Sequence, residues 1–294
     1  MQQAPTSLHG SVEPGRTDRH DLSLDPDLSD LREHYDVGLE KDRLDSALGV
    51  VEFERTKEIL ARHLPEPPAM VADIGGGPGR YAVWLAQAGY EVVLRDIVPR
   101  HVDEARAAAD AAGVRIDAGL GDARSLDLEE GSVDGVLLLG PLYHLGGRKD
   151  RLRALREARR VVRPGGIVYV AAISRWIARL HAVVVLRAYE RFPEALDLVS
   201  DVERTGRLPP LFPGDFTGYC HRPSQLRAEI RSADLEVLDM VSVEGLAFAL
   251  PDLQERLETD RGRAVLMDAV RALERVPELL GLGPHLIVTA MRQP

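Results

Sequence analysis

The sequence predicts an α/β protein built on a doubly wound, mostly parallel sheet of seven strands, with helical insertions that cap the sheet. Two observations support this fold class. Short apolar runs alternate with segments whose apolar residues recur at helical spacing, and turn residues separate one from the next. Such repeated strand–helix units indicate parallel strands, because a parallel crossover needs the length of a helix. The expected strands are 70–74, 91–94, 114–118, 133–139, 167–173, 235–243 and 285–291.

The expected helices fill the intervals between these strands. In the first helix, Leu48, Val51, Ile59 and Leu60 recur at helical spacing, and the prolines that begin with Pro65 stop the run. The later helices follow the same reasoning. They are expected over 81–87, 100–112, 148–162 and 224–233, after the first at 48–64.

Two long stretches interrupt the alternation, at 174–223 and 244–283. Residues 175–208 and 252–280 have a helical pattern, and a loop rich in proline and glycine follows the first of them. We expect both interruptions to cap the sheet rather than to form an independent domain, because neither supplies a sheet of its own.

Composition narrows the class of protein. The 294 residues carry 37 Lys plus Arg against 47 Asp plus Glu, a net charge of −10. This balance argues against a basic face for nucleic-acid phosphates. The single cysteine, Cys220, excludes an internal disulfide and a cysteine-based zinc site. No stretch approaches the roughly 20 apolar residues of a membrane span, and the N-terminus lacks an apolar signal core. We therefore expect a cytoplasmic protein with no membrane partner.

A glycine-rich turn between the first strand and the next helix is the most informative motif. Gly75, Gly77 and Gly79 follow Asp73, so the backbone can turn tightly and approach a ligand without a Cβ in the way. The dinucleotide fingerprint would require a glycine where Arg80 stands, which argues against a pyrophosphate. No Gly-Lys-Ser/Thr follows, so the turn is not a P-loop either.

Four more motifs follow in order along the chain. An acid, Asp96, ends the second strand, and Gly121–Ala123 follows the third. Leu139–Leu145 comes after the fourth strand, and Arg163–Gly166 precedes the fifth. Together with Asp73–Gly79, these motifs resemble those of the class I S-adenosylmethionine (SAM)-dependent methyltransferases, over about 35–294. The resemblance implies a Rossmann-like methyltransferase fold and SAM as the cofactor.

The resemblance and the element pattern divide the chain into five segments. Residues 1–30 are polar and show no sustained period, which predicts a disordered tail. The other segments are an N-terminal helical lid (31–68), the SAM-binding core (69–173), a helical cap insertion (174–223) and the completion of the sheet with a helical insertion at 252–280 (224–294).

Three acids have roles that the resemblance implies. Asp96 accepts from both ribose hydroxyls, unless it is a solvated surface acid. Asp122 accepts from the adenine amine while the Ala123 N–H donates to a ring nitrogen; the alternative is an acid that only forms a turn. Asp73 orders the glycine loop and attracts the cofactor's ammonium group, or caps backbone N–H groups alone.

The remaining cofactor contacts come from two loops and the lid. Leu139 and Gly140 would touch the methionine end of the cofactor. In the lid, Tyr35 and Arg43 are the expected contacts, with Arg43 paired to the cofactor carboxylate. The alternative for Arg43 is an ion pair with Asp42 or Asp45 on a solvated helix.

Methyl transfer needs in-line positioning in a dry pocket, and a base only if the acceptor must lose a proton. His144 is a candidate base or a structural histidine. Tyr143 packs over the cofactor or bonds to its methionine part, or else it is a core aromatic. His221 is a third candidate, since Cys220–Pro223 nearly matches an aromatic-His-Arg-Pro string of similar family members, with Cys in place of the aromatic. Its alternative is a histidine at a helix entry. No acidic cluster stands at metal spacing, so we expect no metal.

The function that follows is transfer of a methyl group from SAM to an oxygen, nitrogen or carbon nucleophile of a small metabolite, such as a natural-product intermediate. The alternative is a SAM-binding protein without methyl transfer, with a structural, sensing or rearrangement role. The sequence Gly-Pro-Leu-Tyr at 140–143 differs from the Asn/Asp-Pro-Pro-Tyr signature of base-amine methylation, which disfavours DNA. The sequence leaves the oligomeric state open.

Overall fold

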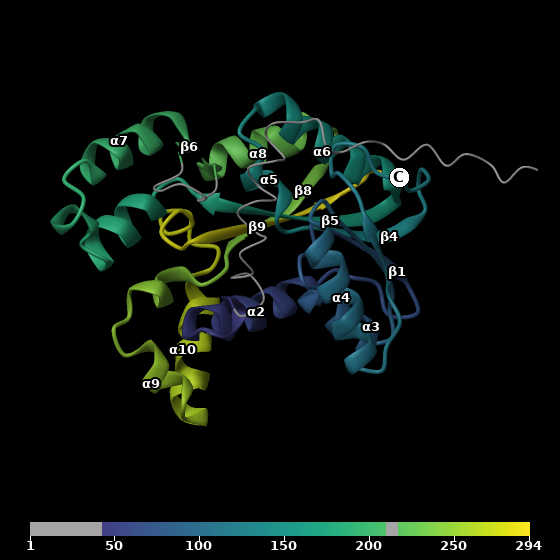
Figure 1. Ribbon diagram of the computed structural model, residues 1–294, viewed down its shortest axis with the longest axis horizontal. Helices are drawn as coiled ribbons and strands as arrows, with labels where there is room; N and C mark the ends of the chain where they lie inside the picture. Colours follow the sequence, from purple (N-terminus) through teal and green to yellow (C-terminus); the bar gives the residue numbers. More distant parts are fainter. Residues whose placement is uncertain (1–42, 210–216) are drawn as a thin grey trace, which may run out of the picture.

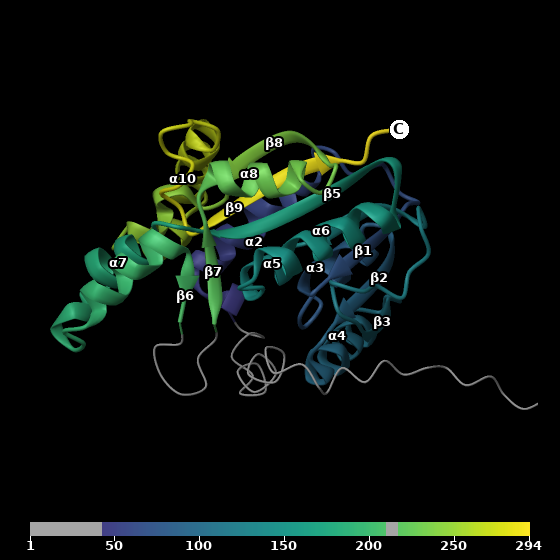
Figure 2. The ribbon, with the colours of Figure 1, turned by 90° about the horizontal axis from the view of Figure 1, so that it is seen from above.

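A computed structural model describes residues 43–209 and 217–294. Within them, nine strands form one mixed sheet in the order β3-β2-β1-β4-β5-β7-β6, and β9 pairs with both β5 and β8 (Figures 1 and 2). The strands are β1 (Met70–Ile74), β2 (Glu91–Asp96), β3 (Asp117–Leu120), β4 (Val133–Leu138), β5 (Val162–Ser174), β6 (Arg207–Leu208), β7 (Gly218–His221), β8 (Glu236–Ser242) and β9 (His285–Met291).

The first five strands are parallel, as the strand–helix alternation predicts. β1 pairs with β2 on one side and with β4 on the other, and β5 continues the parallel pairing beyond β4. At the far side, β9 runs antiparallel between β5 and β8. The carboxyl ends of the parallel strands, the end of β8 and the start of β9 therefore lie at the same edge of the sheet.

Helices cover both faces of the sheet (Figure 2). Apolar residues of α6 (Arg148–Val161) and α8 (Pro223–Arg231) pack in one core cluster with residues of β1, β4 and β5. On the opposite face, a second cluster joins the sheet to α2 (Ala47–Leu60), α3 (Arg80–Gln87) and α4 (Pro99–Ala111). The fold is therefore the doubly wound α/β fold predicted from the sequence.

A third, smaller core cluster lies away from the sheet. It joins α2 to η5 (Gly245–Ala249), α9 (Leu253–Leu257) and α10 (Asp260–Leu273). Figure 1 shows α9 and α10 beside the N-terminal part of α2. Of these elements, α9 and α10 lie within residues 252–280, where the sequence predicts a helical insertion.

The insertion after β5 differs from the expectation of helix followed by loop. It holds a π-helix, η3 (Ala178–Val185), a short η4 (Ala188–Glu190) and α7 (Ala195–Thr205). It also supplies β6 and β7, and β7 pairs with the end of β5, which raises the strand number from seven to nine. Strands of two and four residues are too short to show an alternating pattern in sequence.

The expected tail at 1–30 and the first part of the lid segment, 31–42, lie outside the described residues. The structure describes the lid from η2 (Arg43–Asp45) onward. Among the residues that it describes, no helix is both long and apolar enough to span a membrane.

Candidate functional site

A cleft opens at the carboxyl ends of β1, β2 and β4, where the strand order reverses on either side of β1. Ligands of open α/β sheets bind at such a reversal. The cleft has a volume of about 880 Å³, part of it open to solvent, and its wall includes Gly75, Gly77, Asp96 and the loop after β4. We call it the first cleft.

A second cleft of about 700 Å³ lies on the other side of the glycine loop. Both clefts share Gly75, Gly77, Gly140 and Tyr143 in their walls. The wall of the second cleft also includes residues of α2, α3, β5 and β9. The glycine loop and the start of the β4–α6 connection thus lie between two adjoining spaces.

At two of the three glycines of the loop, neighbouring atoms leave no room for a side chain. A Cβ on Gly75 would lie 2.6 Å from Cγ of Pro141, so a side chain there would push apart the loops after β1 and β4. Gly79 has a φ of 83° and precedes α3, and its Cβ would lie 2.9 Å from Cβ of Ala105 in α4. Gly77 faces the first cleft, with nothing within 4 Å of where its Cβ would be.

Asp96 is tied to the glycine loop. Its Oδ2 accepts the N–H of Gly77 at 2.9 Å, and its Oδ1 accepts the N–H of Val98 at 2.8 Å. A carboxylate offers about four lone-pair positions, so these two bonds fix its orientation and leave acceptor capacity toward the cleft. Nδ1 of His101 lies 3.3 Å from Oδ1, and His101 also lines the first cleft. Sequence reasoning missed His101, which follows no motif.

Asp73 is a buried acid in the wall of the second cleft. Burial, followed by the nearby charge of Asp96, raises the pKa of Asp73 to about 7. Its Oδ2 is buried with no hydrogen-bond partner among the described residues. A buried carboxylate in this position fits a cationic group of a ligand, whose charge would favour the ionised form.

Asp122 and Ala123 both line the first cleft. Asp122 also forms the turn that was its alternative role, since its Oδ1 accepts the backbone N–H of Arg124 at 2.8 Å. In addition, the Arg124 guanidinium pairs with Oδ2 of Asp122 at 2.8 Å. Sequence reasoning did not anticipate this ion pair, which occupies part of the carboxylate's acceptor capacity. The adenine contact of Asp122 stays a prediction.

Leu139 and Gly140 precede the short helix α5 (Pro141–His144) and line the second cleft, Gly140 the first as well. Tyr143 lines both clefts, whereas His144 lines the first. The Tyr143 and His144 rings contact each other, with 4.6 Å between their centroids. Both residues therefore lie beside the clefts, as expected, and their roles stay predictions.

His221 lies away from both clefts. Its side chain is fully buried, and Nε2 lies 3.3 Å from Oε2 of Glu229. Glu229 in turn pairs with Arg151 at 2.8 Å and 2.9 Å. Burial lowers the pKa of His221 although Glu229 acts in the opposite direction. His221 is in the wall of neither cleft, and its role as a base stays a prediction.

The structure describes little of the two cofactor contacts expected from the lid, Tyr35 and Arg43. Tyr35 lies outside the described residues. Arg43 begins η2, but its side chain is also outside what the structure describes. Asp45, one alternative partner of Arg43, lies 3.0 Å from the guanidinium of Arg80.

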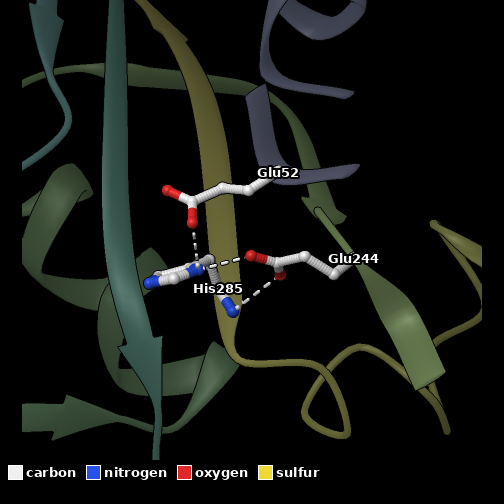
Figure 3. A group of neighbouring side chains, drawn as sticks. All are labelled: Glu52, Glu244 and His285. Atoms are coloured by element: carbon white, nitrogen blue, oxygen red, sulfur yellow. Dashed lines mark hydrogen bonds and ion pairs between the residues drawn. The ribbon is translucent and has the colours of Figure 1, made fainter. Parts of the chain in front are cut away.

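The second cleft contains a cluster that the sequence did not reveal (Figure 3). Glu52 of α2, Glu244 after β8 and His285 at the start of β9 bring one ligand atom each to within 4.8 Å of one another, a group able to hold a cation. Sequence reasoning found no acidic cluster at metal spacing, because these residues come from three distant segments. Only the fold brings them together.

The residues of the two clefts fit SAM. Asp96 presents a carboxylate that suits a sugar diol, and Ala123, Ile97 and Val98 line the same cleft. The partnerless Oδ2 of Asp73 fits an ammonium group. The hydrogen-bonding groups of the two clefts therefore match the two parts of SAM, the adenosine and the charged amino-acid end.

Comparison with known proteins agrees with this fit. Residues 72–170, about a third of the chain, match the family described as methyltransferase domain. An uncharacterized methyltransferase of Mycobacterium bovis is 31% identical over 147 residues, which cover 47% of this chain and 57% of the relative. A ubiquinone/menaquinone biosynthesis C-methyltransferase of Acidiphilium cryptum is 34% identical over 122 residues, 40% of this chain and 48% of the relative. The chain thus spans about half the length of the curated relatives it matches.

Solved structures show the same fold. A protein of Pyrococcus horikoshii aligns with a TM-score of 0.59 at 15% identity, over 89% of this chain and 99% of that one. A SAM-dependent methyltransferase of Methanosarcina mazei aligns with a TM-score of 0.55 at 20% identity, over 80% and 97%. The fold is that of the Rossmann-like methyltransferases, and the resemblance to the class I SAM-dependent methyltransferases is confirmed.

Proposed function

We propose that this protein is a SAM-dependent methyltransferase that acts on a small molecule. The observation that carries the proposal is the position of Asp96: a carboxylate at the end of β2, held by the N–H of Gly77 and open to a cleft at the strand-order reversal. A cleft of about 880 Å³ lies within the range of small-molecule sites.

When bound, SAM supplies an electrophilic methyl group on a sulfonium, which the acceptor takes while a neutral thioether is left. The protein's residues bind and orient. Asp96 holds a sugar diol, and Asp73 balances an ammonium charge. Tyr143, which lines both clefts, contributes to the wall between the cofactor and the acceptor. In-line positioning of the acceptor can contribute several kcal/mol in such a site, up to about 7–11 kcal/mol in well-oriented model reactions.

The second cleft is the proposed place of the acceptor, beside the methionine end of SAM at Asp73. Leu139, Ala171, Val243 and Ile287 give it an apolar lining, which suits an apolar metabolite with one polar reacting group. Relatives are named for methylation at carbon or at oxygen in ubiquinone biosynthesis. We therefore propose an oxygen or carbon nucleophile first and an amine second, in a cytoplasmic setting.

The test is incubation of the full chain with SAM that carries a trideuterated methyl group and a panel of phenols, enolisable ketones and amines. Mass spectrometry should find a trideuteromethylated product, and the Asp96→Ala variant should form much less of it at subsaturating SAM. Tight binding of SAM with no product and no S-adenosylhomocysteine across the panel would favour the alternative, a SAM-binding protein without methyl transfer.

A further inference from the structure

Glu52, Glu244 and His285 come from three segments and meet beside the second cleft (Figure 3). Glu52 lies on α2, Glu244 follows β8, and His285 begins β9. Ser242 at the end of β8 pairs with Leu286 of β9, which brings Glu244 to His285. Glu52 and His285 line the cleft, whereas the Glu244 side chain has no exposed surface. We call the three residues the carboxylate–imidazole cluster.

The spacing of the ligand atoms in the cluster suits one metal ion. One ligand atom of each residue lies within 4.8 Å of the other two. Metal bonds of about 2.0–2.2 Å place two ligands of one ion about 3–4 Å apart. Oε2 of Glu52 and Nδ1 of His285 meet this requirement at 3.9 Å. Oε1 of Glu244 lies 2.5 Å from Nδ1 in a hydrogen bond, so these two atoms need to separate by less than about 1 Å when an ion replaces the shared proton.

The backbone of β9 orients the buried carboxylate. Oε2 of Glu244 accepts the backbone N–H of His285 at 3.1 Å, and this bond leaves Oε1 directed at the ring. Ligating carboxylates in metal sites are themselves held by hydrogen bonds of this kind. The arrangement of Glu244 and His285 is therefore set before any ion binds.

The surroundings of the cluster are apolar. Val243 and Ile287, neighbours of the ligands along the chain, are at most 2% exposed. The side chains of Glu52 and His285 are 12% and 21% exposed, and that of Glu244 is fully buried. Charged groups in such a place are costly unless opposite charge balances them. A divalent cation balances two carboxylates and takes the imidazole as a neutral ligand.

We propose that the carboxylate–imidazole cluster binds one first-row divalent metal ion, such as Zn²⁺ or Fe²⁺, beside the second cleft. An imidazole ligand suits these ions, whereas Mg²⁺ and Ca²⁺ prefer oxygen ligands. The ion ties α2 to the end of β8 and the start of β9. Three protein ligands leave at least one coordination position for water or another ligand. The proposal replaces the sequence-based expectation of no metal, and it depends on neither SAM nor an acceptor.

The first test is calorimetric titration of the full chain, freed of metal with a chelator, with Zn²⁺. We expect one ion per chain, a Kd in the micromolar range or tighter, and a rise of the melting temperature. Loss of an outer partner costs 10–100-fold in metal affinity, so loss of a ligand in Glu52→Gln or His285→Gln should cost at least about 100-fold. Mg²⁺ should bind far more weakly than Zn²⁺.

The matched controls are Glu236→Gln and His63→Gln, which change an exposed residue of the same type. Both should bind Zn²⁺ as tightly as the wild type. A wild type that binds no Zn²⁺ in a saturable way would overturn the proposal. So would equal Zn²⁺ affinity in the wild type, Glu52→Gln and His285→Gln, because the ion would then lie elsewhere.

The second test identifies the ligand atom in the wild-type protein, whose folding no substitution disturbs. Long-range proton–nitrogen correlation spectra of the full chain, labelled with ¹⁵N-histidine, resolve the ring nitrogens of the nine histidines. One equivalent of Zn²⁺ should shift Nδ1 of a single histidine, and the spectrum of His285→Gln should lack that signal. A shift confined to another histidine, or to Nε2 of His285, would refute the site.

The metal site and the proposed function fail independently. If the protein methylates an acceptor but binds no Zn²⁺, the proposed function stands and the metal site is wrong. If Zn²⁺ binds through His285 and no methylation is found, the metal site stands and the proposed function is wrong.

Discussion

The N–H of Gly77 donates to Oδ2 of Asp96 at 2.9 Å, so the loop after β1 and the acid after β2 form one unit. The two residues come from neighbouring parallel strands, whose carboxyl ends meet at one edge of the sheet. The bond holds the carboxylate at the cleft before any ligand binds. Binding therefore loses less conformational entropy, because this side chain is already ordered.

Replacement of this acid should weaken cofactor binding. We expect Asp96→Ala to lower the free energy of SAM binding by about 1.5–3 kcal/mol, the range for a hydrogen bond to a charged group. Isothermal titration calorimetry measures it. The control is Asp127→Ala, which removes a mostly exposed carboxylate that pairs with Arg95 at 2.9 Å. Equal SAM affinity in the wild type and Asp96→Ala would refute the sugar-binding role.

The raised pKa of Asp73 predicts that SAM binding releases a proton. With a pKa of about 7, most molecules carry a protonated Asp73 at pH 6.5. An ammonium group placed beside it favours the ionised form, so binding should release the larger part of one proton and should tighten as the pH rises through 7. Calorimetry at pH 6.5 in two buffers of different ionisation enthalpy counts the proton. In Asp73→Asn the release should disappear; a wild type whose binding heat is independent of the buffer would contradict the assignment.

Gly79→Ala should destabilise the fold in two ways, by a steric clash with Ala105 and by the strain of a left-handed backbone conformation. The left-handed φ of 83° costs an alanine about 1–2 kcal/mol, and the close approach to Ala105 adds about 1–3 kcal/mol of overpacking. Gly113→Ala is the matched control, since Gly113 has a φ of 68° and no atom within 4 Å of its Cβ position. Urea unfolding should therefore show the larger loss for Gly79→Ala, and equal losses would rule out the contact with α4.

Acid should unfold the protein partly through Glu229. Burial alone would raise the pKa of Glu229, but hydrogen bonds from Arg151 and His221 lower it to about 2. Since the folded-state pKa lies below the usual 4.5, the stabilisation is complete above about pH 4.5 and is lost as the pH falls toward 2, by about 3 kcal/mol.

Glu229→Gln tests this dependence. The variant should be less stable at pH 7 by about 3–5 kcal/mol, because Arg151 is left buried without its partner. Its stability should also fall less steeply than that of the wild type between pH 4.5 and 3 in urea titrations. Parallel pH profiles for the two proteins would show that the ion pair does not govern acid stability.

The parallel core was predictable from sequence because its signals are local. Buried strands such as β1 read as short apolar runs, and Gly75 to Gly79 mark the turn beside the cleft. The second strand was predicted over 91–94, and β2 extends two residues further, to Asp96, the acid that the family resemblance singled out.

Long-range contacts could not be predicted in this way. The sequence shows that Cys220–Pro223 resembles a family string, yet only the fold shows that His221 faces Glu229 eight residues on. Likewise, Glu52, Glu244 and His285 have no common spacing, and they meet because α2 lies beside the antiparallel pair of β8 and β9. The strands β6 and β7 escaped notice because neither is long enough to show a period.

A crystal structure of the full chain with S-adenosylhomocysteine tests the central claim most directly. The account predicts a nucleoside in the first cleft, with both ribose hydroxyls within hydrogen-bond distance of the Asp96 carboxylate and the amino group next to Asp73. A first cleft that stays empty at saturating ligand, or a nucleoside bound elsewhere with Asp96 uninvolved, would contradict it.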